Sequence, residues 1–401
     1  LHLAGGVRGC PPPVLERPGH HPVPLLPPGV HGGEPQGRAG GPRGLGRDPA
    51  DRHRARAMID PHVHLREPGA THKEDWDSAT TAALAGGFTT ILAMPNTRPP
   101  VTDRPSLDLS LQAANSKARC DYAQFLGAGA ENLDVVRELA PQTAGLKMYL
   151  DQTYGPLRLD EMTLWMEHFR RWPQDCPIVA HAESRTLAAV ILMAAIFDRS
   201  VHLAHVSLAE EILLIREAKS RGIKVTCEVT PHHLFLTDED ISQLGFGRSE
   251  VRPRLARPAD RDALWANLDV IDCFATDHAP HTMEEKDSAN PPPGFPGLET
   301  ALPLLLTAVA DGRLNMNDLV QRMVHNPRRI FAIPEQPETW VEVDMDANWE
   351  LRAADTFTRC AWTPFEGMQV RGRVRRVVLR GQEVVKDGQV FAQPGTGKRI
   401  R

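Results

Sequence analysis

Short apolar runs alternate with amphipathic segments along the chain from Met58 onward. The segment Leu208–Arg221 is typical of the amphipathic ones: Ile212 and Ile215 recur at helical spacing, and Gly222 follows as a C-terminal stop. Strand-like runs that alternate with helices predict parallel strands. Eight repeats indicate an α/β fold, a (β/α)8 TIM-type barrel with its helices outside. The eight runs are Met58–His64, Phe88–Met94, Cys120–Gly127, Gly145–Leu150, Pro177–His181, Val201–Val206, Ile223–Val229 and Val270–Thr276.

Three regions differ in their patterns. Residues 1–56 are rich in Pro, Gly and Arg and lack helical or strand periodicity, which predicts disorder. Residues 57–335 are expected to form the barrel. Residues 336–401 are expected to form a helix or loop and a small β appendage, built largely by C-terminal strands at Arg375–Leu379 and Val384–Val390, with a tail. A doubly wound open sheet is the alternative to the barrel, but the chain has no GxGxxG turn that would favour it.

Composition narrows the function classes. The 401 residues carry a formal net charge of −5, which argues against nucleic acid or a membrane surface as a partner. No apolar run approaches the roughly 18–20 residues that a membrane span needs. The six Cys show no CxxC pairing, so neither a disulfide framework nor a zinc ribbon is indicated. We expect a cytoplasmic protein.

Metal-binding side chains follow several of the apolar runs. His62 and His64 are two residues apart, so on a strand both imidazoles face one side. A single buried histidine is more often a hydrogen-bonded core residue than a metal ligand. Six potential ligands at the same rim of a barrel, however, indicate a metal centre. Four His and one Asp suit Zn²⁺. The six groups are His62, His64, Lys147, His181, His205 and Asp277.

Lys147 is the unusual member of this set. It lies between Leu146 and Met148 on a predicted central strand, where an unpaired charge is expensive to bury. An amine that has captured CO₂ becomes a carbamate with two oxygens, one for each of two metal ions. The sequence therefore predicts two metals bridged by carboxylated Lys147.

Several contiguous motifs resemble those of dihydroorotases, members of the amidohydrolase superfamily. The similarity runs from about Met58 to Gln389 and is strongest to the dihydroorotase domain of animal trifunctional pyrimidine-biosynthesis proteins. The motifs are Asp60–Gly69, Met94–Thr97, Gly145–Leu150, Thr276–His281 and Pro293–Gly297.

The resemblance implies a ligand set and a reaction. His62, His64 and Asp277 would bind one Zn²⁺, His181 and His205 the other, and N6-carboxylated Lys147 would bridge them. A hydroxide between the metals would attack an amide carbonyl, with Asp277 as general acid/base. The reaction would be the reversible cyclisation of N-carbamoyl-L-aspartate to L-dihydroorotate and water, in pyrimidine biosynthesis.

The resemblance also implies substrate contacts and partners. Arg66 shares the strand parity of His64 and can form a two-pronged contact with a carboxylate. The chain would form a homo-oligomer and would be fused to, or associated with, carbamoyl-phosphate synthetase and aspartate transcarbamoylase. The implied substrate contacts are Arg66, Asn96, Arg252, His281 and the backbone of Pro293 and Gly294, under a lid that contains Thr153 and Tyr154.

Two departures and two alternatives accompany this interpretation. First, the sequence of residues 1–56 shows no strand pattern that could begin the appendage. Second, Ala204 stands where the animal domain has a cysteine. A further metal contact near Glu228 that required this cysteine would therefore be affected. Dihydropyrimidinase and allantoinase share the barrel, but they act on cyclic amides without this carboxylate, so Arg66 and Asn96 favour dihydroorotase. A non-catalytic scaffold barrel is the other alternative, although such proteins typically lose metal ligands.

Overall fold

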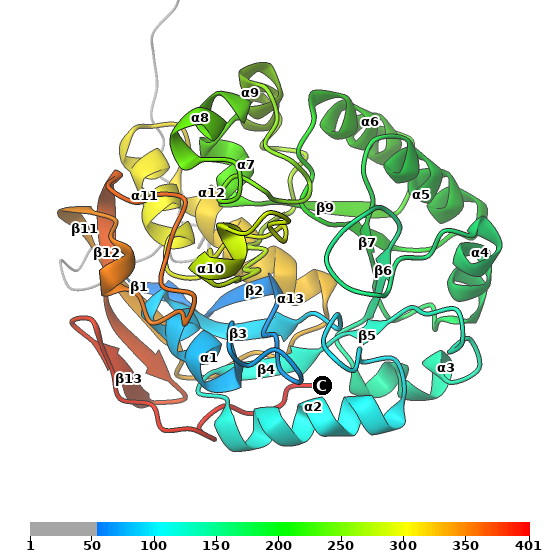
Figure 1. Ribbon diagram of the computed structural model, residues 1–401, viewed down its shortest axis with the longest axis horizontal. Helices are drawn as coiled ribbons and strands as arrows, with labels where there is room; N and C mark the ends of the chain where they lie inside the picture. Colours follow the sequence, from blue (N-terminus) through cyan, green and yellow to red (C-terminus); the bar gives the residue numbers. More distant parts are fainter. Residues whose placement is uncertain (1–53) are drawn as a thin grey trace, which may run out of the picture. The chain divides into compact units, whose positions relative to one another are not determined.

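A parallel barrel forms the body of the protein (Figure 1). The computed structural model describes residues 54–401, so the disorder expected of residues 1–53 lies outside the described residues. All eight apolar runs contain barrel strands. These strands are β2 (Met58–Val63), β3 (Phe88–Ala93), β4 (Asp121–Gln124) with its continuation β5 (Leu126–Gly127), β6 (Leu146–Tyr149), β7 (Ile178–His181), β8 (Val201–Leu203), β9 (Val225–Val229) and β10 (Cys273–Phe274).

Parallel pairing joins the strands in chain order. Strands β2, β3 and β4 form one arc, and β5 to β10 form the other. Phe125 joins the arcs, because it connects β4 to β5 and its N–H donates to the carbonyl of Ala93 at 2.9 Å. A parallel bridge between Val63 and His278 links the ends of the first and eighth repeats. This confirms the TIM-type barrel and excludes the open sheet.

Helices occupy the crossovers and lie outside the strands (Figure 1). Local sequence explains where the first two begin: Asp75 and Asp103 each accept a hydrogen bond from the backbone N–H of a serine three residues later. The crossover helices are α1 (Trp76–Ala85), α2 (Arg104–Lys117), α3 (Val136–Leu139), α4 (Met162–Arg171), α5 (Arg185–Ile196), α6 (Ala209–Ser220), α7 (Pro231–Phe235), α8 (Ile241–Leu244) and α9 (Pro258–Ala266). After β10 come α10 (Met283–Lys286), α11 (Ala301–Ala310), α12 (Met316–Val320) and α13 (Asn326–Ile330).

The core lies on both faces of the barrel strands. Every residue of β2 and of β3 is buried, as expected for parallel strands covered by helices. Trp76 of α1 and Tyr122 of β4 pack with ring centroids 5.1 Å apart. Among the helices of residues 54–401, none has the length and apolar character needed to cross a membrane.

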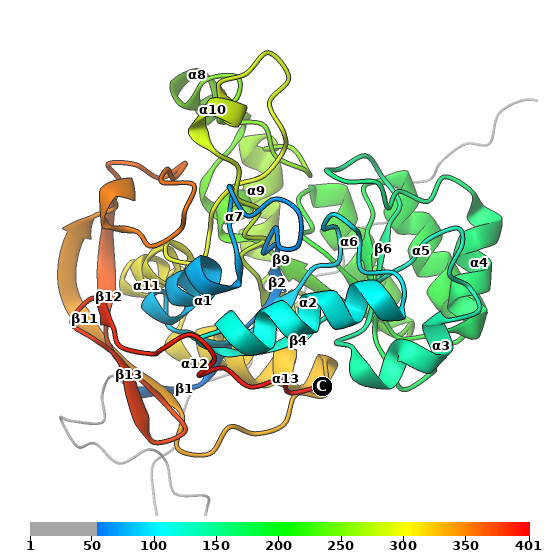
Figure 2. The same cartoon turned by 60° about the horizontal axis from the view of Figure 1, so that its bottom comes forward.

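The β appendage is a five-stranded sheet that begins earlier in the chain than the sequence predicts. Its five antiparallel strands run in the order β1 (Arg54–Arg56), β11 (Trp340–Glu350), β12 (Gln369–Leu379), β13 (Gln382–Lys386) and β14 (Gln389–Val390). Figure 2 shows β11, β12 and β13 side by side. The prediction of disorder up to residue 56 is wrong for residues 54–56, which pair with Trp340–Glu342.

Strand β11 also lies where a helix or loop was expected. Only Val341 and Val343 are buried among its eleven residues, and its register with β12 shifts after Glu342 and after Asp344. A strand with so few buried side chains has a weak alternating pattern. The pairing with β12 therefore determines its conformation.

Candidate active site

The predicted metal-binding side chains come from the C-terminal ends of the barrel strands, where barrel enzymes carry their active sites. Three residues at this rim have positive φ although none is glycine: Arg66 at 60°, His205 at 36° and Asp277 at 45°. Such conformations cost of order 1–3 kcal/mol each and persist where the surrounding structure imposes them. The backbone therefore has a strained conformation at three of the residues that the sequence predicts to belong to the site.

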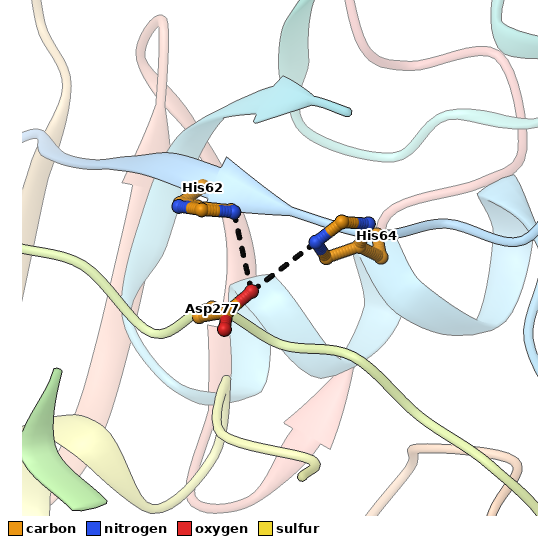
Figure 3. Close-up of side chains that lie close together, drawn as sticks. All are labelled: His62, His64 and Asp277. Atoms are coloured by element: carbon orange, nitrogen blue, oxygen red, sulfur yellow. Dashed lines mark ion pairs between the residues drawn. The ribbon is translucent and has the colours of Figure 1, made fainter. Parts of the chain in front are cut away.

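His62, His64 and Asp277 form the tightest group (Figure 3). Asp277 Oδ1 lies 3.2 Å from Nε2 of His62 and 3.2 Å from Nε2 of His64. All three side chains are buried, and their candidate ligand atoms lie within 4.8 Å of one another. Two imidazole nitrogens and a carboxylate oxygen that converge in this way can hold a divalent metal ion.

The outer nitrogens of both histidines have partners. His62 Nδ1 lies 2.5 Å from Glu228 Oε1, and His64 Nδ1 lies 2.6 Å from Asn96 Oδ1. These contacts fix each ring so that Nε2 faces Asp277. Glu228 also contacts His202 Nε2 through its other oxygen at 3.0 Å. Both carboxylate oxygens are therefore engaged behind His62, a position different from the further metal contact expected of Glu228.

Lys147 lies fully buried on β6. Its Nζ has no hydrogen-bond partner among the described residues. Burial lowers the pKa of Lys147 to about 8, although the negative charges of Glu228 and Asp277 oppose the shift. A buried amine that lacks a partner is costly, and a lowered pKa makes the reactive neutral amine more accessible.

His181 and His205 lie beside the tight group but are not part of it. Their ring centroids are 4.5 Å apart, and the centroid of His205 lies 5.4 Å from that of His62. His205 Nδ1 is buried and has no partner among the described residues. Burial holds the pKa of His205 well below its usual value, so the ring is neutral and a nitrogen lone pair is available.

A cavity joins these side chains to the predicted substrate contacts. Arg66 donates from Nε to the carbonyl of Pro280 at 3.0 Å, while its buried Nη1 has no partner in the described part of the chain. Asn96 donates from Nδ2 to the carbonyl of Tyr154 at 2.9 Å. The cavity is lined by His62, His64, Arg66, Asn96, Tyr149, Thr153, Tyr154, His181, His205, Arg252, Asp277, Ala279, Pro293 and Gly294.

Gly294 lines the cavity in a conformation that excludes other residues. Its φ is +143°, and a Cβ at this position would lie 2.3 Å from the carbonyl oxygen of Ala279. The close approach presents the backbone of Pro293 and Gly294 to the cavity. Arg252 lines the same cavity, and its Nη1 lies 2.7 Å from Glu250 Oε1.

His281 occupies a different place from its neighbours in the predicted substrate set. It is fully buried and does not line the cavity. Its Nε2 lies 3.0 Å from Arg66 Nη2, and its Nδ1 lies 3.0 Å from Lys73 Nζ. In this structure His281 therefore supports Arg66 from behind.

Sequence reasoning missed three residues near the site. Lys73 also forms an ion pair with Glu285 at 2.9 Å and donates to the hydroxyl of Tyr154 at 3.3 Å. Tyr149 lines the cavity, with a buried hydroxyl that has no partner within residues 54–401. Its position two residues after Lys147 on one strand could have revealed it, whereas no local pattern marks Lys73 or His202.

Comparisons with known proteins identify the family of the chain. Residues 57–336 match the model of the Amidohydrolase family. The chain is 56% identical over 344 residues to the multifunctional protein CAD of Squalus acanthias, covering 86% of this chain but only 15% of that protein's length. It is 35% identical over 356 residues to a dihydroorotase of Pyrococcus furiosus, covering 86% of this chain and 84% of the relative. The chain therefore belongs to the amidohydrolase family and, within it, to the dihydroorotases.

Two solved structures are also similar. The L-hydantoinase (dihydropyrimidinase) of Arthrobacter aurescens has a TM-score of 0.81 at 24% identity, with 86% of this chain and 88% of that one covered, which shows the shared fold. The inactive dihydroorotase-like domain of a CAD-like multifunctional protein from Chaetomium thermophilum has a TM-score of 0.75 at 28% identity, with 87% of this chain and 99% of that one covered.

Proposed function

We propose that the protein is a dihydroorotase that interconverts N-carbamoyl-L-aspartate and L-dihydroorotate in pyrimidine biosynthesis. One observation carries the proposal: the cavity lined by His62, His64 and Asp277 is also lined by Arg66, whose buried Nη1 has no hydrogen-bond partner among residues 54–401. A buried cationic donor without a protein partner suits a substrate carboxylate.

We propose two zinc ions as cofactors. His62, His64 and Asp277 would hold one, His181 and His205 the other, and N6-carboxylated Lys147 would bridge them. The unpartnered Lys147 Nζ and His205 Nδ1 fit this assignment, because both are buried polar atoms that otherwise lack a partner among the described residues. Bound zinc would polarise the amide carbonyl and activate water.

Asp277 would move the proton. Burial raises the pKa of its carboxyl group, which favours a residue that both accepts and donates a proton. In ring opening, water adds to the ring amide carbonyl, the C–N bond breaks, and Asp277 carries a proton from the water to the departing nitrogen. In ring closure the ureido nitrogen forms that bond, and water leaves.

Recognition would depend on Arg66, Asn96 and Arg252, with His281 acting through Arg66. Arg66 would bind the substrate carboxylate with two donors, and Asn96 would donate to the same group. The backbone of Pro293 and Gly294 would contact the ring. Thr153 and Tyr154 would cover the bound substrate as a lid.

We also propose the cellular setting. The similarity to multifunctional proteins supports a chain that is fused to other enzymes. We propose carbamoyl-phosphate synthetase and aspartate transcarbamoylase as these fused or associated partners, and a chain that works as a homo-oligomer in the cytoplasm. The substrate of this site would then be supplied by a carbamoyl transfer to aspartate.

A second candidate function is that of a non-catalytic scaffold barrel. The similarity to the inactive dihydroorotase-like domain from Chaetomium thermophilum supports this alternative. All six predicted ligands are present in this chain, which favours the enzyme. The test is turnover of dihydroorotate, dihydrouracil and allantoin by the purified chain, together with its metal content. We expect close to two zinc ions per chain and turnover of dihydroorotate alone. Absence of both metal and turnover would support the scaffold, and turnover of dihydrouracil or allantoin would support a related cyclic amidase.

A further inference from the structure

Lys286 at the end of α10 is a fully buried lysine outside the site described above. Its Nζ donates to three backbone carbonyls: Glu250 at 2.7 Å, Pro292 at 3.0 Å and Gly294 at 3.2 Å. An ammonium has three N–H donors, so these carbonyls satisfy all of them. Nζ also lies 5.6 Å from the ring centroid of Phe295 and 5.4 Å from that of Trp362. Backbone oxygens and aromatic faces therefore surround the charge.

The three carbonyls belong to two separate segments that both reach the cavity. The first segment contains Glu250 and Arg252, and the second contains Pro292, Pro293 and Gly294. The segments also contact each other directly, because the N–H of Gly294 donates to the carbonyl of Glu250 at 3.1 Å. Lys286 therefore connects the segment that carries Arg252 to the segment that presents its backbone to the cavity.

The chain approaches Lys286 unusually closely at Gly247. A Cβ at that glycine would lie 1.6 Å from the carbonyl oxygen of Lys286, so only glycine permits this packing. The loop that leads to Arg252 is thus seated directly on the end of α10.

Burying the amine of Lys286 has a desolvation cost that its contacts must offset. No carboxylate in the described part of the chain forms an ion pair with Lys286, and burial lowers the pKa of its amine to about 7. A methionine could fill the space between Phe295 and Trp362 at a lower desolvation cost. What methionine cannot do is donate hydrogen bonds to three carbonyls.

We propose that Lys286 is a positioning residue for substrate recognition, which sets the placement of Arg252 and of the Pro293–Gly294 backbone without contacting the substrate. The inference rests on the proposed function for its catalytic consequence. Lys286 does not line the cavity, and its three hydrogen bonds go to backbone carbonyls, none of them from a predicted metal ligand. Its loss should therefore weaken substrate binding while metal content stays unchanged.

The test compares Lys286→Met with wild type by two measurements. The first is amide hydrogen exchange without substrate, in which we expect faster exchange across 250–254 and 292–296 in the folded variant. The second is steady-state kinetics with dihydroorotate. Leaving buried carbonyls unpaired costs about 1–3 kcal/mol, so KM should rise by roughly 5- to 150-fold, with kcat within about threefold of wild type and zinc content the same.

A matched control is Lys219→Met. Lys219 also donates to a backbone carbonyl, that of Val270 at 2.6 Å, and it pairs with Asp272 at 2.5 Å. Unlike the segments that Lys286 joins, neither of these partners lines the cavity. This variant should lower the melting temperature without changing KM. If Lys286→Met does not fold, Lys286→Gln retains two N–H donors and should give a smaller rise in KM in the same direction.

Two results would overturn the inference. Unchanged exchange in both segments of a folded variant would show that Lys286 does not position them. An unchanged KM would show that the positioning has no consequence for recognition. A wild-type chain that fails to turn over dihydroorotate would instead count against the proposed function, because the exchange measurement needs no substrate.

Discussion

His62 and Glu228 are joined by a 2.5 Å contact between Nδ1 and Oε1, although 166 positions separate them along the chain. Glu228 is fully buried and also contacts His202, so its carboxylate lies between two imidazoles. The nearby histidines hold the pKa of Glu228 well below its usual range despite burial. A carboxylate in this position fixes the tautomer of His62 and leaves Nε2 free for a metal ion.

Replacing Glu228 with Gln should weaken metal binding. One amide oxygen can still accept a hydrogen bond, but the NH₂ group must face one of the two imidazoles. Loss of such a partner typically costs 10- to 100-fold in metal affinity, which equilibrium competition with a chelator would measure. Glu217→Gln is the control, because Glu217 is exposed and pairs only with Arg221 in the described structure. Equal affinities in both variants would contradict the role of Glu228.

Lys147→Ala should lower metal content and activity together. The substitution removes the amine that would carry the bridging carboxylate. Metal analysis and turnover of the same preparation check this, and a small carboxylic acid with excess zinc should partly restore activity. A variant with two metals per chain and full turnover would refute the assignment.

Asp277→Asn should separate proton transfer from substrate binding. The amide keeps the size of the side chain but cannot accept the proton, so kcat should fall by roughly 10²–10⁴. The measurement is kcat with dihydroorotate on protein whose zinc content has been matched to wild type. A near-normal kcat at equal metal content would rule out the proton-transfer role.

Arg66→Lys should act on recognition instead. Lysine keeps the charge but loses the two-pronged geometry, so KM for dihydroorotate should rise by roughly tenfold or more. Dihydrouracil lacks the carboxylate and should remain an equally poor substrate of wild type and variant. If KM and kcat/KM for dihydroorotate do not change, Arg66 does not bind the carboxylate, and the main reason to prefer dihydroorotase over related cyclic amidases is lost.

Glu299 should make stability depend on pH. Burial raises the pKa of Glu299 from 4.5 to about 8, while its carboxylate accepts backbone hydrogen bonds from Phe357 and Thr358. Between pH 4.5 and 8 the unfolded chain releases this proton and the folded chain retains it, so Glu299 lowers stability as pH rises. The melting temperature of Glu299→Gln relative to wild type should therefore increase from pH 5 to pH 8. A difference that does not change with pH would contradict this.

The barrel strands and the candidate metal-binding side chains could be predicted from the sequence. Strand and helix periodicities are local, so eight apolar runs with intervening helices were enough to predict the strands from Met58 to Phe274. The parity of His62 and His64 is equally local, and the barrel rule then places Asp277 at the same rim. The structure brings these three residues together as that reasoning requires.

The contacts that support those side chains could not be predicted, because they depend on the tertiary structure. Glu228 behind His62, His281 behind Arg66 and Lys286 beneath two loops all depend on contacts between segments distant in sequence. Strand β1 is ordered because it pairs with β11, nearly three hundred positions away. A buried polar group needs a hydrogen-bond partner, and a local pattern of apolar and polar residues does not specify which distant residue that partner is.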